Sequence, residues 1–282
     1  MWRTWNNNFF TYKAGNITLD YKDSGANGAA MRILPIALAN NVFTNSSAYS
    51  ISEITRIEFS FNFKINGSRE RKIIIDSTLI ENNHINEVIL FSHGFKGFKD
   101  WGPFNEIANF FALNGYVFIK FNFSYNGTNF QNPNDFVDLN AFGNNNFCTE
   151  LDDLELVINW IYSKYPDCKV SLFGHSRGGA ISILKSNENN QIDKVISWAS
   201  PSNLISRLPD ADRARKWKDT NVLYVYNGRT KQNMPMFYQF YQNCIENIER
   251  LFGKTAFTKY IFCDTGADKD EALEPYRDSG YL

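Results

Sequence analysis

Hydrophobic and polar positions follow two different periods along the chain from about residue 51 onward. Between Ile54 and Ile65 apolar and polar residues alternate one by one, which is typical of a strand with one buried face. Asn66-Gly67 is a hairpin signal, and a second strand is predicted over Arg71–Ile75. The pattern therefore predicts an antiparallel pair at the start of a sheet.

After this pair, short runs of apolar residues alternate along the chain with segments whose apolar residues have helical spacing. The runs predict buried strands at Val88–Phe91, Tyr116–Phe121, Val170–Phe173, Val195–Ala199 and Lys259–Phe262. Apolar residues at helical spacing predict helices over Asn105–Leu113, Glu150–Tyr162 and Ala180–Lys185. Alternation of this kind predicts an α/β fold, in which a mostly parallel sheet carries helices on both faces.

Two segments depart from this rhythm. Residues 1–50 are polar and poorly periodic, with one predicted helix over Ala29–Ala39, and we expect an irregular N-terminal segment before a domain over residues 51–282. Between about 203 and 255, a charged stretch precedes a predicted strand over Val222–Tyr226 and the aromatic cluster MPMFYQFYQ. We predict that this insertion between late strands forms a lid. A last helix is predicted over Asp264–Asp270.

The aromatic share, 16% of the 282 residues, favours a large packed core or an aromatic-lined pocket over disorder. The net charge of −1 gives no basic footprint for a nucleic-acid partner. No apolar stretch reaches the roughly 18 residues that a membrane helix needs, and no signal-peptide pattern opens the chain, so we expect a cytoplasmic protein without a membrane partner. The four cysteines are scattered without a C-x-x-C pair, which predicts reduced structural thiols and no metal or redox use.

The motif with the clearest chemistry is Gly174-His175-Ser176-Arg177-Gly178, a G-x-S-x-G pattern. It lies between the strand predicted over Val170–Phe173 and the helix predicted over Ala180–Lys185. Its glycines permit a turn that a Cβ atom would crowd, and a serine at the tip projects above the carboxyl ends of parallel strands. Ser176 is therefore the candidate nucleophile. The alternative is a serine in an ordinary strand-to-helix turn.

A second loop supports this interpretation. Ser92-His93-Gly94-Phe95-Lys96-Gly97 follows the strand predicted over Val88–Phe91, where a His-Gly loop supplies a donor to an oxyanion. We assign the backbone N–H of Phe95 as one donor and that of Arg177 as the other. Each such donor is worth about 3–4 kcal/mol in an acyl-transfer transition state. The alternative is a glycine loop without a catalytic role.

Four motifs together resemble the α/β-hydrolase superfamily, in particular its dienelactone-hydrolase-like and serine-aminopeptidase-like branch. They are SHGFKGFKDWG (92–102), DLNAFGNNNFCTELDDLELVINWI (138–161), GHSRGG (174–179) and NGRTKQNMP (227–235). The resemblance covers about residues 74–251. It implies an α/β-hydrolase fold and a serine hydrolase, without a cofactor, whose partner is a small ester or peptide substrate.

In that family a catalytic acid follows the seventh strand and a histidine follows the eighth. The resemblance makes Asp268, just beyond the strand predicted over Lys259–Phe262, the candidate acid. Asp264 is the alternative, and a solvated acidic loop is the other interpretation. The sequence stops before an eighth strand, so we expect a sheet without its last strand, whose exposed edge could pair in a homodimer.

The triad histidine has no counterpart after Ser176, because all three histidines precede it: His84, His93 and His175. We expect His93 to brace the oxyanion loop, His175 to pack away from the nucleophile and His84 to be exposed. Loss of a triad histidine typically lowers the rate by about 10⁴–10⁶. A truncated gene, a rearranged gene and a pseudoenzyme remain open as explanations.

The N-terminal segment carries a separate resemblance. Residues 23–40, which begin DSGANGAAMR, are similar to a segment of the ADP-ribosylglycohydrolases, a magnesium-dependent helical family whose paired-carboxylate metal motifs have no match here. The sequence therefore predicts a serine hydrolase of esters or short peptides, impaired by the missing histidine. The alternatives are a catalytically degenerate binding protein of the same fold and an ADP-ribose-processing protein.

The predicted lid and Arg177 leave the substrate open. Met and aromatic side chains at Met234, Met236, Phe237, Tyr238, Phe240 and Tyr241 either wall an apolar acyl pocket or pack the lid onto the body. The Arg177 side chain either attracts an acidic substrate group or has a structural role.

Overall fold

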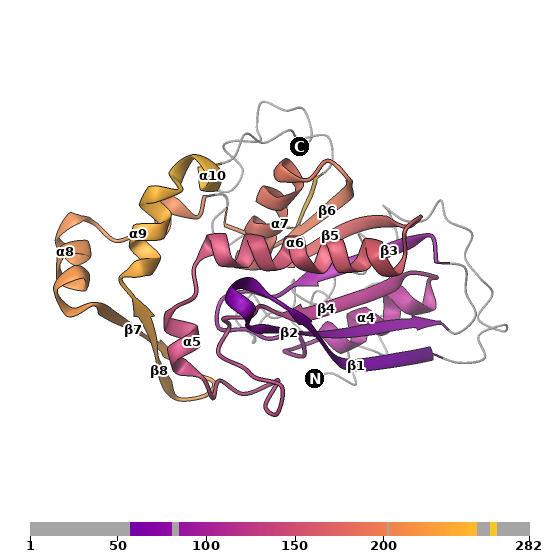
Figure 1. Cartoon of the computed structure of the whole chain (residues 1–282), viewed down its shortest axis with the longest axis horizontal. Helices are drawn as coiled ribbons and strands as arrows, with labels where there is room; N and C mark the ends of the chain where they lie inside the picture. Colours follow the sequence, from indigo (N-terminus) through magenta and orange to yellow (C-terminus); the bar gives the residue numbers. More distant parts are fainter. Residues whose placement is uncertain (1–56, 81–84, 202, 253–259, 264–282) are drawn as a thin grey trace, which may run out of the picture.

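The computed structural model describes residues 57–80, 85–201, 203–252 and 260–263. They form a seven-stranded sheet in the order β1-β2-β4-β3-β5-β6-β9 (Figure 1). Its strands are β1 (Ile57–Asn66), β2 (Lys72–Ile80), β3 (Glu87–Ser92), β4 (Val117–Asn122), β5 (Lys169–His175), β6 (Ile192–Trp198) and β9 (Tyr260–Cys263). The pairs β1–β2 and β2–β4 are antiparallel, and the other neighbours are parallel. The mostly parallel sheet predicted from the sequence is confirmed.

The hairpin predicted at Asn66-Gly67 joins β1 to β2 through a short 3₁₀ turn, η2 (Ser68–Glu70). Gly67 is required there, because a Cβ atom would lie 2.7 Å from Ile73 Cγ1 and 2.8 Å from the Arg71 carbonyl oxygen. β2 continues past the predicted end at Ile75 as far as Ile80. The extension carries buried polar residues, which an apolar pattern cannot reveal.

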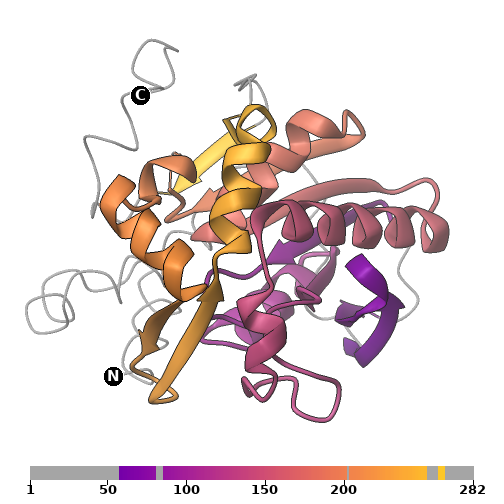
Figure 2. The same cartoon turned by 60° about the vertical axis from the view of Figure 1, so that its left-hand side comes forward.

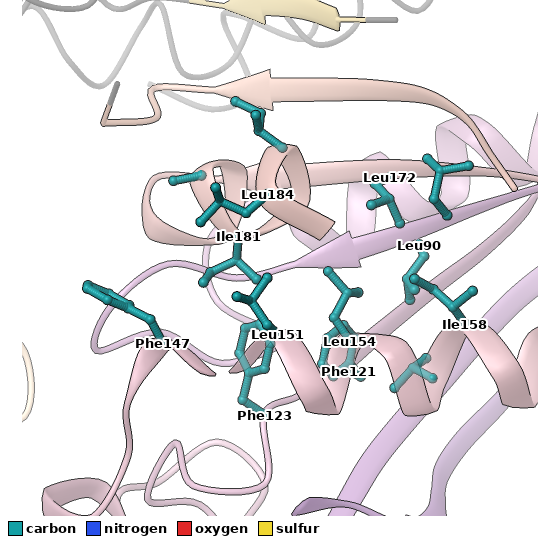
Figure 3. Packing of buried hydrophobic residues seen from close by; sticks show 14 of the residues in the cluster. Leu90, Phe121, Phe123, Phe147, Leu151, Leu154, Ile158, Leu172, Ile181 and Leu184 are labelled. Atoms are coloured by element: carbon teal, nitrogen blue, oxygen red, sulfur yellow. The ribbon is translucent and has the colours of Figure 1, made fainter. Parts of the chain in front are cut away.

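Helices cover both faces of the sheet, as predicted. They are α4 (Phe104–Leu113) on one face and α6 (Phe147–Lys164) with α7 (Arg177–Glu188) on the other (Figure 1). Alternate residues of β3 serve the two cores: Ile89 and Phe91 pack with α4, whereas Val88 and Leu90 pack with α6 and α7. Figure 3 shows the second core, with Leu90 among side chains of α6 and α7.

A charged cluster is buried beneath the segment that links β3 to α4. Lys99 Nζ lies 2.6 Å from Asp76 Oδ2 and 2.5 Å from Asp100 Oδ2. Lys120 Nζ, from β4, bonds to Asp100 and lies 3.5 Å from Asp76 Oδ2. Two lysines therefore offset two aspartates in the interior, and Lys99 and Asp100 tie the segment after β3 to the sheet.

The segment between β6 and β9 lies outside the main sheet, and we call its residues 203–252 the cap. It contains η3 (Ile205–Arg207), α8 (Ala211–Thr220), β7 (Val222–Asn227), β8 (Gln232–Phe237), α9 (Gln239–Glu246) and α10 (Ile248–Phe252). β7 and β8 form a separate antiparallel hairpin. The cap lies at the left of Figure 1 and comes forward in Figure 2, with its hairpin beside α5 (Leu139–Gly143).

Some expectations fall on residues that the structure does not describe. Residues 1–50 and the helices predicted over Ala29–Ala39 and Asp264–Asp270 lie outside the described residues. Within the described part of the chain, no helix has the length and apolar character needed to cross a membrane.

Candidate active site

Ser176 lies at the tip of a tight turn between β5 and α7. Its backbone has φ 54° and ψ −126°, a conformation that costs a residue with a side chain about 1–3 kcal/mol. Its N–H donates to the Trp198 carbonyl oxygen at 2.8 Å, at the end of β6. A Cβ atom on Gly174 would lie 2.2 Å from the Gly178 carbonyl oxygen, so glycine is required for this turn. The side chain of Ser176 is only partly buried.

The loop after β3, residues 93–101, packs directly against this turn. A Cβ atom on Gly94 would lie 2.9 Å from Ser176 Cβ. No described residue accepts a hydrogen bond from the backbone N–H of Phe95 or of Arg177. The Arg177 amide belongs to the first turn of α7, where helices leave N–H groups unpaired and the helix dipole favours negative charge. Phe95, Ser176 and Arg177 line one cavity, so the structure brings these predicted site residues together.

His93 braces the 93–101 loop, as expected. Its Nδ1 lies 2.9 Å from the Gly94 carbonyl oxygen, and its Nε2 lies 3.5 Å from the Phe123 backbone nitrogen. A neutral ring satisfies both contacts, with Nδ1–H as donor and Nε2 as acceptor. Burial lowers the pKa of His93 to about 4, so the ring is neutral near pH 7. Both ring nitrogens are therefore engaged.

His175 packs into an aromatic cluster. Its ring centroid lies 4.8 Å from that of Trp198, 5.8 Å from Phe104 and 6.2 Å from Trp101. Burial, together with the positive charge of Arg229, lowers the pKa of His175 to about 4. Neither His93 nor His175 lines the cavity at Ser176. His84 lies outside the described residues.

The cavity at Ser176 has a volume of about 490 Å³ and is mostly apolar. Its lining comprises Phe95, Phe147, Ser176, Arg177, Ala199, Pro201, Leu204, Leu208, Pro209, Trp217, Leu223, Val225, Met236 and Phe240. Of the lid side chains predicted to wall a pocket, Met236 and Phe240 do so, whereas Met234 is fully buried in a cluster with Phe136 and Phe142. The cap thus supplies most of the apolar lining.

Arg177 contributes a charged side chain to the lining of this cavity, and that side chain also contacts Phe95 and Glu150. Its guanidinium carbon lies 4.2 Å from the centroid of the Phe95 ring, and Nη1 lies 3.4 Å from Glu150 Oε1. Asn145 Nδ2 donates to the same Glu150 oxygen at 2.7 Å. Burial raises the pKa of Glu150, and Arg177 opposes that shift. The charge of Arg177 is therefore partly offset before any ligand enters. Sequence reasoning assigned no role to Glu150 or Asn145.

The candidate acid follows the last strand of the sheet in the sequence. Asp268 and its alternative Asp264 both lie outside the described residues. They follow β9, which pairs in parallel with β6, and Trp198, the partner of the Ser176 amide, pairs with Cys263 at the end of that ladder. Among the residues that the structure describes, no group of three or more His, Cys, Asp or Glu side chains could hold a metal ion.

Comparisons with known proteins agree with the fold. No family model and no curated protein sequence matches the chain. Among solved structures, Est1E from Butyrivibrio proteoclasticus with bound ferulic acid aligns at 15% identity and TM-score 0.53, over 71% of this chain and 77% of that chain. DcsB in complex with its substrate analogue aligns at 14% identity and TM-score 0.52, over 69% and 77%.

A brefeldin A esterase, a bacterial homologue of human hormone-sensitive lipase, aligns at 16% identity and TM-score 0.43, and this chain spans only 52% of that protein's length. The strand order and these likenesses define an α/β-hydrolase fold. At such low identity they establish the fold alone.

Proposed function

We propose that this protein is a serine hydrolase that acts on esters or short peptides through an acyl-enzyme at Ser176. The observation that carries the proposal is the convergence on one cavity of Ser176, at positive φ, and the amides of Phe95 and Arg177, which donate to no residue that the structure describes. Est1E, whose structure was solved with bound ferulic acid, gives the fold a precedent for binding a small carboxylic acid.

In the proposed reaction, Ser176 Oγ attacks the substrate carbonyl carbon and transfers its proton to a water molecule. Negative charge collects on the carbonyl oxygen, where the amides of Phe95 and Arg177 stabilise it. Collapse of the intermediate expels the alcohol or amine with a proton, and water later releases the acid. Asp268 is the proposed acid of this site, although no histidine follows Ser176 in the 282 residues for it to orient.

The rate of this reaction is limited by the lack of a general base beside Ser176 in the part of the chain that the structure describes. No histidine follows Ser176 in the 282 residues, and His93 and His175 are both engaged elsewhere. A serine without a base is a poor nucleophile near pH 7. We therefore propose that the 282 residues alone hydrolyse substrates slowly, through the oxyanion donors and the cavity.

The lining of the cavity favours a substrate whose acyl group is apolar and binds beside Ser176. Its lining offers aromatic and aliphatic side chains and a single, partly offset, charge at Arg177. Aromatic and methionine side chains adapt to acyl groups of different shape.

A fluorophosphonate probe tests the proposal directly, because it labels only a serine that can be activated. We expect slow labelling of the full chain, none in Ser176→Ala, and unchanged labelling in Ser163→Ala, whose serine is exposed on α6. Hydrolysis of nitrophenyl esters should follow the same order. Folded protein that stays unlabelled at high probe concentration would sink the proposal.

A second candidate is a binding protein with a degenerate hydrolase fold. It is favoured by one observation: the apolar cavity is fully formed although both described histidines are occupied elsewhere. Trp217 lines the cavity, so an apolar carboxylic acid that binds there should change its fluorescence. A change that Trp217→Phe removes, in protein that the probe does not label, would favour this candidate.

A further inference from the structure

We infer that the β7–β8 hairpin of the cap positions the 93–101 loop for acyl transfer, and that Arg229 is the positioning residue. The inference rests on the proposed function of Ser176. It assigns to the cap a role in the reaction rate in addition to its place in the cavity wall.

The loop contains a strained turn at the point where the oxyanion donor lies. Gly97 N–H donates to the Gly94 carbonyl oxygen at 3.0 Å, which closes a turn with Phe95 and Lys96 at its centre. Lys96 has φ 55°, in the left-handed region that favours glycine. Such a residue persists only where neighbouring groups hold it. The Phe95 amide therefore depends on contacts that fix Lys96.

Two contacts that fix Lys96 come from the hairpin. Lys96 Nζ donates to the Tyr226 carbonyl oxygen at 3.0 Å, and Arg229 Nη2 donates to the Lys96 carbonyl oxygen. The two bonds run in opposite directions between segments 130 and 133 residues apart in sequence. The end of β7 and the hairpin turn thus hold both the side chain and the main chain of Lys96.

Arg229 also reaches the far end of the 93–101 loop. Its guanidinium carbon lies 4.4 Å from the centroid of the Trp101 ring, a cation–π contact that is worth about 0.5–1 kcal/mol at an exposed site. Asn227, which is buried at the start of the hairpin turn, accepts a hydrogen bond from the Arg229 backbone N–H at 3.3 Å. One side chain therefore contacts the loop at Lys96 and at Trp101.

The same hairpin joins the loop to the cavity. On β8, Met234 and Met236 belong to an apolar cluster that includes Phe95 and Phe98 of the loop. On β7, Leu223 and Val225 line the cavity. A ligand in the cavity therefore lies against the structure that holds the oxyanion donor.

The primary test compares Arg229→Ala with Arg215→Ala, which removes an exposed arginine from α8 of the same cap. Loss of an oxyanion donor costs about 10²–10³ in kcat. Displacement of the loop that carries it should cost less, so we expect kcat for a nitrophenyl ester to fall about tenfold in Arg229→Ala, with KM changed by less than about threefold. Arg215→Ala should match the wild type, and Arg229→Lys should recover part of the loss.

Hydrogen exchange gives a readout that does not require activity. Amides of the 93–101 loop should exchange faster in Arg229→Ala than in Arg215→Ala, while those of β5 should exchange alike in both. Faster loop exchange together with a lower kcat supports the inference. Wild-type exchange in Arg229→Ala, or faster exchange with unchanged kcat, overturns it.

If the wild-type chain neither labels nor hydrolyses, the proposed function fails. What remains of the inference is that Arg229 holds the 93–101 loop in place. The exchange rates of the loop amides confirm or contradict that statement without any activity.

Discussion

A Cβ atom on Gly178 would lie 2.3 Å from the carbonyl oxygen of Ser92. The first turn of α7 therefore touches the end of β3 through main-chain atoms alone. Because Ser176 precedes α7 and the 93–101 loop follows β3, this contact sets the separation between the candidate nucleophile and the loop that carries Phe95.

Gly178→Ala should destabilise the protein and disturb the site. The neighbouring atoms belong to the main chain and cannot move aside cheaply, so we expect the free energy of unfolding to fall by about 3 kcal/mol. Gly228→Ala is the matched control, because the nearest atom to its Cβ would be Tyr226 Cε1 at 3.9 Å. Denaturant unfolding measures both variants, and equal stability of the two would contradict the contact.

Ser176 should be replaced by glycine more easily than by alanine. At φ 54° and ψ −126° glycine carries no steric penalty, so Ser176→Gly should be more stable than Ser176→Ala by about 1 kcal/mol. At Ser182, inside α7, the order should reverse, because glycine weakens a helix by about 0.5–1 kcal/mol relative to alanine. Thermal unfolding of the four variants tests the strain at the turn independently of any activity.

The two described histidines should make stability depend on pH. Burial lowers the pKa of His93 and His175 from 6.5 to about 4, so the unfolded chain binds more protons than the native protein between these values. The free energy of unfolding should therefore fall as the pH is lowered through this window, by about 3 kcal/mol for each histidine at pH 4.

His175→Phe should remove one of these two contributions. The substituted ring can keep the aromatic contacts of His175 with Trp198 and Phe104, while the titrating group is lost. Unfolding curves measured from pH 7 to pH 4 should show a shallower dependence than in the wild type. An unchanged slope would mean that His175 does not titrate below its ordinary range.

The buried charge cluster should be sensitive to the loss of one partner. Burial raises the pKa of Asp100, but Lys120 and Lys99 outweigh it and hold that pKa below its ordinary value. Lys120→Met leaves Asp76 and Asp100 with one buried lysine, so we expect a loss of about 3–5 kcal/mol in the free energy of unfolding.

Two further variants give this test its controls. Lys216→Met changes an exposed lysine on α8 and should be nearly neutral. Adding Asp100→Asn to Lys120→Met removes the excess negative charge and should restore part of the stability. Destabilisation that this second substitution does not relieve would point to lost packing rather than charge.

The regular part of the fold could be predicted from local patterns. The helix predicted over Glu150–Tyr162 is α6, which starts earlier because Asn146 Oδ1 accepts a hydrogen bond from Thr149 N–H at 2.9 Å. Local patterns failed where polar residues or proline lie in strands. β2 runs on through buried Asp76, which pairs with lysines from other elements, and β8 includes Pro235.

In the cap as well, the apolar pattern failed to predict a helix. The stretch over Asp210–Asp219 has too few apolar residues for a helical pattern, with Ala214 and Trp217 buried, yet it forms α8. Asp210 begins that helix as its N-cap, since its side chain accepts a hydrogen bond from Arg213 N–H. A capping aspartate was the signal that could have found α8.

In the candidate site, too, local features could be predicted from the sequence, whereas contacts between distant residues could not. The turn at Ser176 follows from glycine positions a few residues apart, which a motif records. The contact of Arg177 with Glu150 and that of Arg229 with Lys96 join distant parts of the chain, and no spacing in the sequence encodes them. The stretch NGRTKQNMP carries a family resemblance, but the contact of its Arg229 with Lys96 is visible only in the fold.

The place of the cap in the chain has a consequence for protein engineering. The cap leaves the sheet after β6 and the chain returns as β9, the strand that pairs with β6. A different cap could be grafted between these two neighbouring strands without altering the order of the sheet. Because cap residues form most of the apolar lining while Ser176 lies in the turn after β5, such a chimera should change which ligands bind and leave the candidate nucleophile in place.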